Sequence, residues 1–183
     1  MDNHSILPTS YEIFSDFDEL QPDAFANLKG GPLAPSLRGR ILLYQLSDGV
    51  YIRTYIVGIP VNTTTGQKVD FHGFHIHEFG NCTVGNPADP FTAAGGHWNP
   101  TNQPHPFHAG DLPPILSTNG TAMMSVYTSA FNVRDVIGKS FILHEKADDF
   151  MTQPAGNSGL RLACGVIQST APSRSTGFFG RRQ

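Results

Sequence analysis

Two histidines separated by one residue, His75 and His77, are the first residues in this sequence whose spacing suggests chemistry. On a β-strand, side chains two positions apart point to the same face, so both imidazoles would project together while Ile76 packs on the opposite side. Two imidazoles on one rigid edge can chelate a metal ion. A His-x-His pair alone is weak evidence, because two ordinary surface or hydrogen-bonded histidines explain it better, so it predicts a metal site only with partners.

A second group of polar residues follows in a stretch rich in proline and glycine. Pro104, Pro106 and Gly110 interrupt any helical pattern there, so the stretch is a loop that needs an external reason to be ordered. Three imidazoles and one carboxylate form a tetrahedral set suited to zinc, and a site with no open position is structural rather than catalytic. The loop therefore predicts a zinc site made of His97, His105, His108 and Asp111.

His144 ends an apolar run and directly precedes an acidic segment that contains Asp148. Alone, such a histidine would more often be a hydrogen-bonded core residue than a ligand. Asp148 could orient ligand imidazoles through their second nitrogens. A site of four histidines with room for a fifth ligand suits Cu(II), which can change oxidation state where zinc cannot.

The chain contains two cysteines, Cys82 and Cys164, which are too few for a disulfide-dense scaffold and too far apart for a CxxC motif. A disulfide between them would tie the metal loop to the last predicted strand, and two separate buried thiols are the alternative. Arg161 lies on that last strand, so the same tie would fix a guanidinium near the copper site. An ordinary salt-bridged arginine is the competing interpretation.

Short strands must position these residues. The composition of 19 Gly, 14 Pro and 15% charged residues among 183 is typical of many strands and loops. Ser47-Asp48-Gly49 separates two apolar runs, which predicts a hairpin. The predicted strands are Ala24 to Lys29, Arg40 to Leu46, Val50 to Val57, His72 to His77, Thr121 to Thr128, Ser140 to His144 and Arg161 to Ile167. About eight strands and no helix predict an all-β fold, a Greek-key β-sandwich or flattened eight-stranded barrel.

Two segments between these strands, residues 78–119 and 145–160, are too long to be simple turns. Loops beyond ~12 to 15 residues are usually functional or disordered. We therefore expect two long functional loops on a single domain at residues 23–168. Residues 1–22 and 169–183 are expected to form terminal tails, the second with Phe178 and Phe179, to which we assign no function.

Charge and hydropathy restrict the partners. The net charge is −3, and Arg181-Arg182 is the one basic cluster along the sequence, so we expect no nucleic-acid partner. No apolar run approaches ~18 residues, so we expect no membrane span. The N-terminus lacks the features of a signal peptide, which makes a cytoplasmic location the default. A periplasmic or extracellular location stays open because a disulfide suits an oxidising compartment, and exposed apolar strand residues leave a homodimer open.

Five motifs occur in order along the chain: Gly73-Phe74-His75-Ile76-His77-Glu78-Phe79-Gly80, Gly96-His97-Trp98-Asn99-Pro100, His108-Ala109-Gly110-Asp111, His144-Glu145-Lys146-Ala147-Asp148-Asp149, and residues 156–167 from Gly156-Asn157 to Val166-Ile167. Together they resemble the signatures of the copper/zinc superoxide dismutase family over roughly residues 25–168. The position of Cys82 and the run Gly110-Asp111-Leu112-Pro113 are more similar to bacterial members than to animal ones.

The resemblance implies a role for each candidate residue. Copper would bind His75, His77, His97 and His144, and His97 would bridge to zinc, whose remaining ligands would be His105, His108 and Asp111. Asp148 matches the carboxylate that links a copper ligand to a zinc ligand. Arg161 matches the arginine that attracts superoxide, and Cys82 and Cys164 match the intrasubunit disulfide.

Two features depart from the family pattern. Only Pro106 and Phe107 separate His105 from His108, which is a short connection for these zinc ligands. Residues 150–159 contain no lysine, and Ala155 replaces a threonine of the animal enzymes, so electrostatic guidance would be weaker or come from elsewhere.

The function implied by the resemblance is that of a superoxide dismutase, which converts two superoxide anions to oxygen and hydrogen peroxide by Cu(II)/Cu(I) cycling. His97 would be the internal proton carrier. The alternative is a non-enzymatic copper-binding or structural relative, and such proteins commonly lack a copper ligand or the arginine. A copper-only dismutase would lack the zinc set, and a metal-storage protein would show no turnover.

Overall fold

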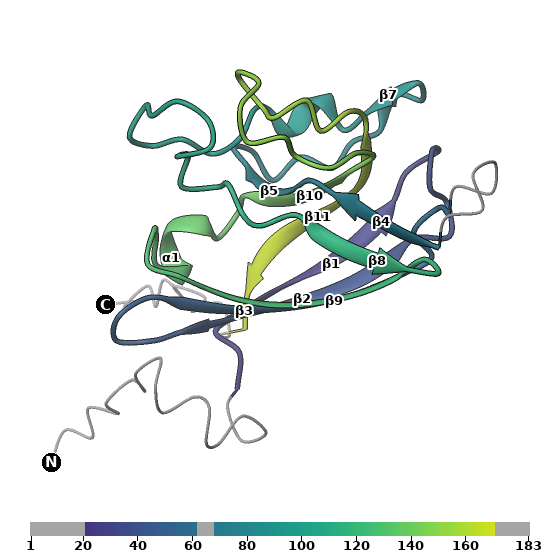
Figure 1. Cartoon of the computed structure of the whole chain (residues 1–183). Coiled ribbons are helices and arrows are strands. Elements are labelled where there is room, and N and C mark those ends of the chain that lie inside the picture. Colours follow the sequence, from purple (N-terminus) through teal and green to yellow (C-terminus); the bar gives the residue numbers. More distant parts are fainter. Residues whose placement is uncertain (1–20, 62–67, 171–183) are drawn as a thin grey trace, which may run out of the picture.

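The computed structural model describes residues 21–61 and 68–170, and it is built almost entirely of antiparallel strands (Figure 1). The strands are β1 (Ala24–Gly30), β2 (Arg38–Gln45), β3 (Val50–Val57), β4 (Val69–His72), β5 (Phe74–His77), β6 (Gly85–Asn86), β7 (Asp89–Pro90), β8 (Ile115–Thr118), β9 (Thr121–Thr128), β10 (Ser140–His144) and β11 (Arg161–Ser169).

Nine of these strands form one sheet in the order β4-β8-β9-β3-β2-β1-β11-β10-β5. The two strands at its ends, β4 and β5, are consecutive in the sequence and are separated only by Gly73. Gly73 itself donates a hydrogen bond from its N–H to Lys146 O (2.7 Å) and accepts one from His144 N–H (2.9 Å). One bent segment thus borders both ends of the sheet, which nearly closes it into a barrel.

The predicted all-β Greek-key barrel is confirmed, with β3 followed in sequence by β4 but paired in the sheet with β9. Two details of the prediction are wrong. Residues His72 to His77 do not form one strand, because the chain changes its pairing partner at Gly73, with β4 paired to β8 and β5 paired to β10. The expected absence of helix is also wrong, since Val133–Val136 forms a one-turn helix, α1, and Thr92–Ala94 a 3₁₀ turn, η2.

The core lies between the two halves of the folded sheet and follows from residue alternation. In β3, Val50, Ile52, Thr54 and Ile56 are buried while the residues between them are partly or fully exposed. The predicted hairpin joins β2 to β3 and is closed by Leu46 N–H donating to Gly49 O (2.8 Å). The Phe74 and Phe141 rings stack with centroids 5.2 Å apart, which packs β5 against β10 on the inside of the barrel.

The two long connections, residues 78–114 and 145–160, gather beside β5 and β10 (Figure 1). The first is shorter than expected because the predicted loop 78–119 also contains β8 at its end. Among the described helices, none is long and apolar enough to cross a membrane.

Candidate metal centre

Backbone hydrogen bonds from β5 set the positions of the ligand loops. Ile76 N–H donates to Gly110 O (2.9 Å), Trp98 N–H donates to Ile76 O (2.8 Å), and Gly110 N–H donates to Trp98 O (2.9 Å). A Cβ at Gly110 would lie 2.3 Å from Ile76 O, so only glycine permits this approach. As a result His75 lies opposite Asp111, and His77 lies opposite His97.

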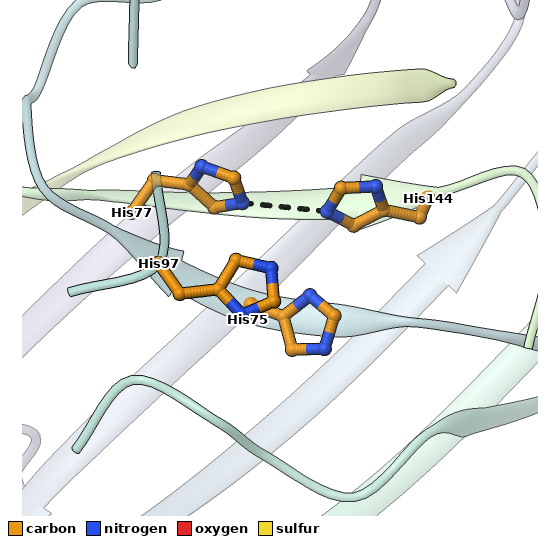
Figure 2. Close-up of side chains that lie close together, drawn as sticks. All are labelled: His75, His77, His97 and His144. Atoms are coloured by element: carbon orange, nitrogen blue, oxygen red, sulfur yellow. Dashed lines mark hydrogen bonds between the residues drawn. The ribbon is translucent and has the colours of Figure 1, made fainter. Parts of the chain in front are cut away.

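Four imidazoles converge beside β5 and the end of β10: His75, His77, His97 and His144 (Figure 2). One nitrogen from each lies within 4.8 Å of the corresponding nitrogen of every other member. His75, His77 and His144 are buried, and His97 is partly buried. The alternation predicted for the His-x-His pair is therefore observed, since His75 and His77 both face this cluster while Ile76 joins the hydrophobic core.

The hydrogen bonds of His77 and His144 leave two lone pairs directed at each other. His77 Nδ1 lies 3.0 Å from Gly95 O, and His144 Nδ1 lies 3.2 Å from Gly159 O. A carbonyl only accepts, so both Nδ1 atoms carry the hydrogen in the neutral rings. The two Nε2 atoms then face each other across 3.3 Å with no proton to share (Figure 2). A cation between these nitrogens would turn a repulsive contact into two coordination bonds.

His75 is oriented in the opposite way. Its Nε2 lies 2.7 Å from Asp148 Oδ2 and must donate, because a carboxylate only accepts. Its Nδ1 is buried without a hydrogen-bond partner, and so is His97 Nε2. Burial lowers the pKa of His75 to about 4, although the hydrogen bond to Asp148 acts in the opposite direction. Burial and then the neighbouring imidazoles lower the pKa of His77 and His144 well below the usual histidine range.

The second cluster is built on the carboxylate of Asp111 and contains His97, His105 and His108. His97 Nδ1 lies 2.7 Å from Asp111 Oδ1, while the Nδ1 atoms of His105 and His108 lie 3.0 and 3.2 Å from Asp111 Oδ2. Burial would raise the pKa of Asp111, but the hydrogen bond from His97 and the nearby imidazoles lower it. Three imidazole nitrogens directed at one carboxylate form a closed set of four donors, which fits zinc.

His105 faces a carboxylate on both sides. Its Nδ1 lies 3.0 Å from Asp111 Oδ2 and its Nε2 lies 2.9 Å from Asp148 Oδ1. A ring with a single N–H can donate to only one of these two carboxylates. A cation held by Nδ1 and Asp111 would use the lone pair of Nδ1 and would leave Nε2–H to donate to Asp148. The short connection from His105 to His108 thus still brings both rings to Asp111.

Asp148 joins the two clusters, because its two oxygens accept from His75 and from His105. Its Oδ1 also accepts from the backbone N–H of Phe150 (2.8 Å). Burial would raise the pKa of this carboxyl, but the hydrogen bonds from His75, Phe150 and His105 lower it strongly. Asp148 is therefore an ionised acceptor that fixes which nitrogen of each ring carries a proton.

Comparison with known proteins agrees with this geometry. The family model described as copper/zinc superoxide dismutase matches residues 38–167. The chain belongs to the copper/zinc superoxide dismutase family. All seven predicted ligands of this family's two metal sites lie in the two clusters, His97 in both.

Relatives of this dismutase family were found in several bacteria. A Cu-Zn superoxide dismutase from Deinococcus radiodurans is 40% identical over 122 residues, which cover 57% of this chain and 67% of that protein. A Cu-Zn superoxide dismutase of Aquifex aeolicus is 32% identical over 171 residues, covering 85% and 92%. A superoxide dismutase-like protein, YojM, of Bacillus subtilis is 40% identical over 111 residues, covering 52% of this chain and 54% of the relative, so this alignment spans about half of that protein.

Arg161 is half-buried, and its positive charge acts on the nearby rings of His77 and His144. Its Nη1 and Nη2 donate to Phe91 O (2.6 Å) and Gly95 O (2.7 Å). Gly95 O is also the acceptor of His77 Nδ1, so one carbonyl positions both the guanidinium and a candidate copper ligand. The sequence pattern did not predict Gly95 as a positioning residue, because a carbonyl leaves no trace in residue type.

Gln153 is a second residue that the sequence pattern missed. Its Oε1 accepts from the His105 backbone N–H (3.0 Å) and its Nε2 donates to His105 O (2.7 Å). These two hydrogen bonds fix the loop of His105 against the loop of Asp148. No signal in the sequence marks this glutamine, since the pair forms only when two loops 48 residues apart meet.

The predicted disulfide between Cys82 and Cys164 is confirmed, with Cα atoms 5.5 Å apart. Cys164 lies with Phe91, Ala94 and Ile142 in a small buried cluster, against which Cys82 packs. The bond therefore attaches the first metal loop to β11 beside Arg161.

Replacing both cysteines by serine is expected to lower the free energy of unfolding by roughly 4 to 5 kcal/mol, because the bond closes a loop of 82 residues in the unfolded chain. Urea denaturation of the parent and of the Cys82→Ser/Cys164→Ser variant would measure this loss. Adding a reductant should reproduce the loss in the parent and leave the variant unchanged. A parent whose urea midpoint does not move on reduction would contradict the prediction.

The metal-free protein is expected to lose stability between pH 6.5 and 4. The unfolded chain takes up a proton on His75 near pH 6.5, whereas the folded chain does so only near pH 4 because burial lowers that pKa. The free energy of unfolding should therefore be unaffected above pH 6.5 and fall by about 3 kcal/mol from His75 alone down to pH 4. The lowered pKa values of His77 and His144 act in the same direction. Urea titrations at pH 7 and pH 5 with equal midpoints would show that the buried histidines do not remain neutral.

Proposed function

We propose that this chain is an enzyme that dismutes superoxide at a joined copper and zinc centre. Two superoxide anions and two protons would give one oxygen and one hydrogen peroxide. The observation that carries the proposal is the pair of donor clusters that share His97, together with the lone pairs of His77 and His144 opposed across 3.3 Å. When bound, copper supplies one-electron chemistry by alternating between Cu(II) and Cu(I), while zinc is redox-inert.

The hydrogen-bond pattern supports a particular donor atom from each residue. The nitrogens that have no proton or no partner on the copper side are His75 Nδ1, His77 Nε2, His97 Nε2 and His144 Nε2. On the zinc side the Nδ1 atoms of His97, His105 and His108 converge on Asp111. His97 would therefore offer Nε2 to copper and Nδ1 to zinc, and its ring would be the shared element.

We assign proton transfer to His97. Its Nε2 is buried and has no hydrogen-bond partner, so this nitrogen can take up a proton while Nδ1 stays on the zinc side. Formation of hydrogen peroxide needs two protons. One proton held on His97 Nε2 would lie at the four-histidine cluster, where the substrate would be reduced, and water would supply the other. Asp148 keeps the rings of His75 and His105 fixed on either side during this exchange.

Arg161 would attract and position the substrate. Superoxide is a small anion, and the guanidinium is held beside the cluster by the carbonyls of Phe91 and Gly95. Hydrogen bonds to two fixed carbonyls keep the group in place while its positive charge acts on an incoming anion. With no lysine in residues 150–159, this arginine and the metals would supply the local positive field.

The second candidate function is that of a non-enzymatic copper-binding relative. It is favoured by one observation, the similarity to the superoxide dismutase-like protein of Bacillus subtilis. The presence of all seven candidate ligands and of Arg161 favours the enzyme.

Metal reconstitution combined with superoxide decay separates the two functions. The full chain would be loaded with copper, with zinc, and with both, and the metal per chain measured alongside the rate of superoxide decay. We expect one copper and one zinc per chain, and catalytic decay in the samples that contain copper. A chain that binds both metals and leaves superoxide untouched would support the non-enzymatic relative instead.

A further inference from the structure

The outer face formed by strands β1, β2, β3 and β9 carries basic side chains, and these four strands contribute no acidic ones. Pairing in register places Lys29 beside Arg38, Arg40 beside Tyr55, and Tyr55 beside Met123, while Arg53 lies two residues before Tyr55 on the same side of β3. The sequences of β1, β2, β3 and β9 contain no Asp or Glu. We call these six exposed residues the basic face: Lys29, Arg38, Arg40, Arg53, Tyr55 and Met123.

A groove of about 480 Å³ crosses the basic face and is lined by Arg40, Arg53, Tyr55 and Met123 among others. Arg40 is held across it, with Nη1 donating to Asn27 Oδ1 (3.0 Å) and the guanidinium 4.6 Å from the centroid of the Phe25 ring. Both of these partners are neutral, so the charge of Arg40 is not compensated by them. The side chain of Met123 is 73% exposed and Tyr55 is 47% exposed. The groove therefore offers apolar area between cations, which fits an acidic segment with aromatic residues.

The chain itself contains such a segment. Residues 1–20 include five acidic residues and no Lys or Arg, so their net charge is −5, while residues 21–183 carry 12 basic and 10 acidic residues and a net charge of +2. The second half of this segment mixes acidic and apolar residues. The acidic ones are Glu12, Asp16, Asp18 and Glu19, and the apolar and aromatic ones are Tyr11, Ile13, Phe14, Phe17 and Leu20.

The segment is also joined to β1, one of the four strands of the basic face. It ends next to Gln21, three residues before β1, and β1 pairs with β2, which carries Arg40 of the groove. Strands lie ~4.8 Å apart, so the distance from β1 across β2 and β3 to β9 is about 14 Å. Lys29 lies eight residues after Gln21, about 26 Å along the strand direction. Ten residues can span about 33 Å, so residues 11–20 can reach the basic face.

We propose that residues 11–20 bind to the basic face of their own chain, with their carboxylates at Lys29, Arg38, Arg40 and Arg53 and their apolar side chains against Tyr55 and Met123. A second copy of the same face is excluded as the occupant, because four cations would oppose four cations. A separate polyanion would have to compete with a segment that is covalently attached and so present at a high effective concentration.

Oxidation of two methionines tests this proposal within one molecule. Met123 on the basic face and Met151 on the second metal loop are 73% and 79% exposed, so without a covering segment hydrogen peroxide should oxidise them at similar rates. In the full chain without added copper, mass spectrometry of peptides should show Met123 reacting at least about threefold more slowly than Met151. About 1 M NaCl should bring the ratio close to one, because the contacts are between exposed charges.

Charge-neutral variants provide the control. Glu12→Gln/Asp16→Asn/Asp18→Asn/Glu19→Gln and Arg40→Gln/Arg53→Gln should each bring the ratio close to one, whereas Arg134→Gln/Lys146→Gln, with two exposed cations removed elsewhere, should leave it unchanged. A ratio near one in the parent, or one that these variants do not alter, would overturn the proposal. Protection of Met123 that appears only after addition of polyglutamate or duplex DNA would overturn it too and assign the face to a separate polyanion.

Discussion

The His144→Ala variant is expected to lose copper and superoxide turnover while it keeps zinc. His144 supplies one of four convergent nitrogens on the copper side and none on the zinc side. Losing a residue that only orients a ligand typically costs 10–100-fold in metal affinity, so loss of a ligand should lower copper affinity by more than about 100-fold. Copper and zinc per chain, measured with the rate of superoxide decay, would show about one zinc, little copper and no catalysis.

The control for this prediction is Arg134→Ala, which removes a side chain that is 85% exposed and belongs to neither cluster. It should bind both metals and turn over superoxide as the parent does. If His144→Ala retained the copper content and the decay rate of the parent, the assignment of the four-histidine cluster as the copper site would be wrong.

The Gly156→Ala variant is expected to weaken both metal sites through Asp148. A Cβ at this position would lie 1.9 Å from Asp148 Oδ1 and 2.7 Å from His105 Nε2. The carboxylate would have to move, and it could no longer accept from both His75 and His105. We expect the affinity for copper and for zinc to fall by about 10–100-fold, measured by competition with chelators.

Gly85→Ala separates this effect from backbone strain. Gly85 and Gly156 have nearly equal positive φ values, 64° and 63°, but a Cβ at Gly85 would have no atom within 4 Å. Gly85→Ala should cost about 1 kcal/mol of stability and leave metal affinity unchanged. Equal metal affinity in the two variants would show that the approach of Gly156 to Asp148 is unimportant.

Local sequence rules predicted part of the arrangement that the structure shows at the candidate site. The spacing of His75 and His77 fixes a shared face on any strand, and the prolines around His105 exclude a helix, so local rules suffice for these residues. The alternation in Val50–Val57 likewise predicted which side chains line the core. The prediction that His97 is shared by the two clusters depends on the resemblance to a family, because nothing local requires His97 to lie beside both His77 and Asp111.

Features that depend on close approach could not be predicted in this way. The break at Gly73 reflects a change of pairing partner, from β8 for His72 to β10 for Phe74, which the sequence of His72 to His77 does not reveal. The hydrogen bonds of Gln153 to His105 and of Arg161 to Gly95 O also form only after the loops meet. The cations of the basic face are spread from residue 29 to residue 53, and strand pairing brings them together where the sequence showed no cluster.

The central claim is that the imidazole of His97 belongs to both metal sites. The most direct test is the electron paramagnetic resonance spectrum of the full chain loaded with Cu(II) and with Co(II) in place of zinc. A shared imidazole couples the two unpaired-electron systems, so the Cu(II) signal should be largely lost compared with the copper and zinc sample. A Cu(II) signal of full intensity beside bound Co(II) would show that the two ions are not joined through His97.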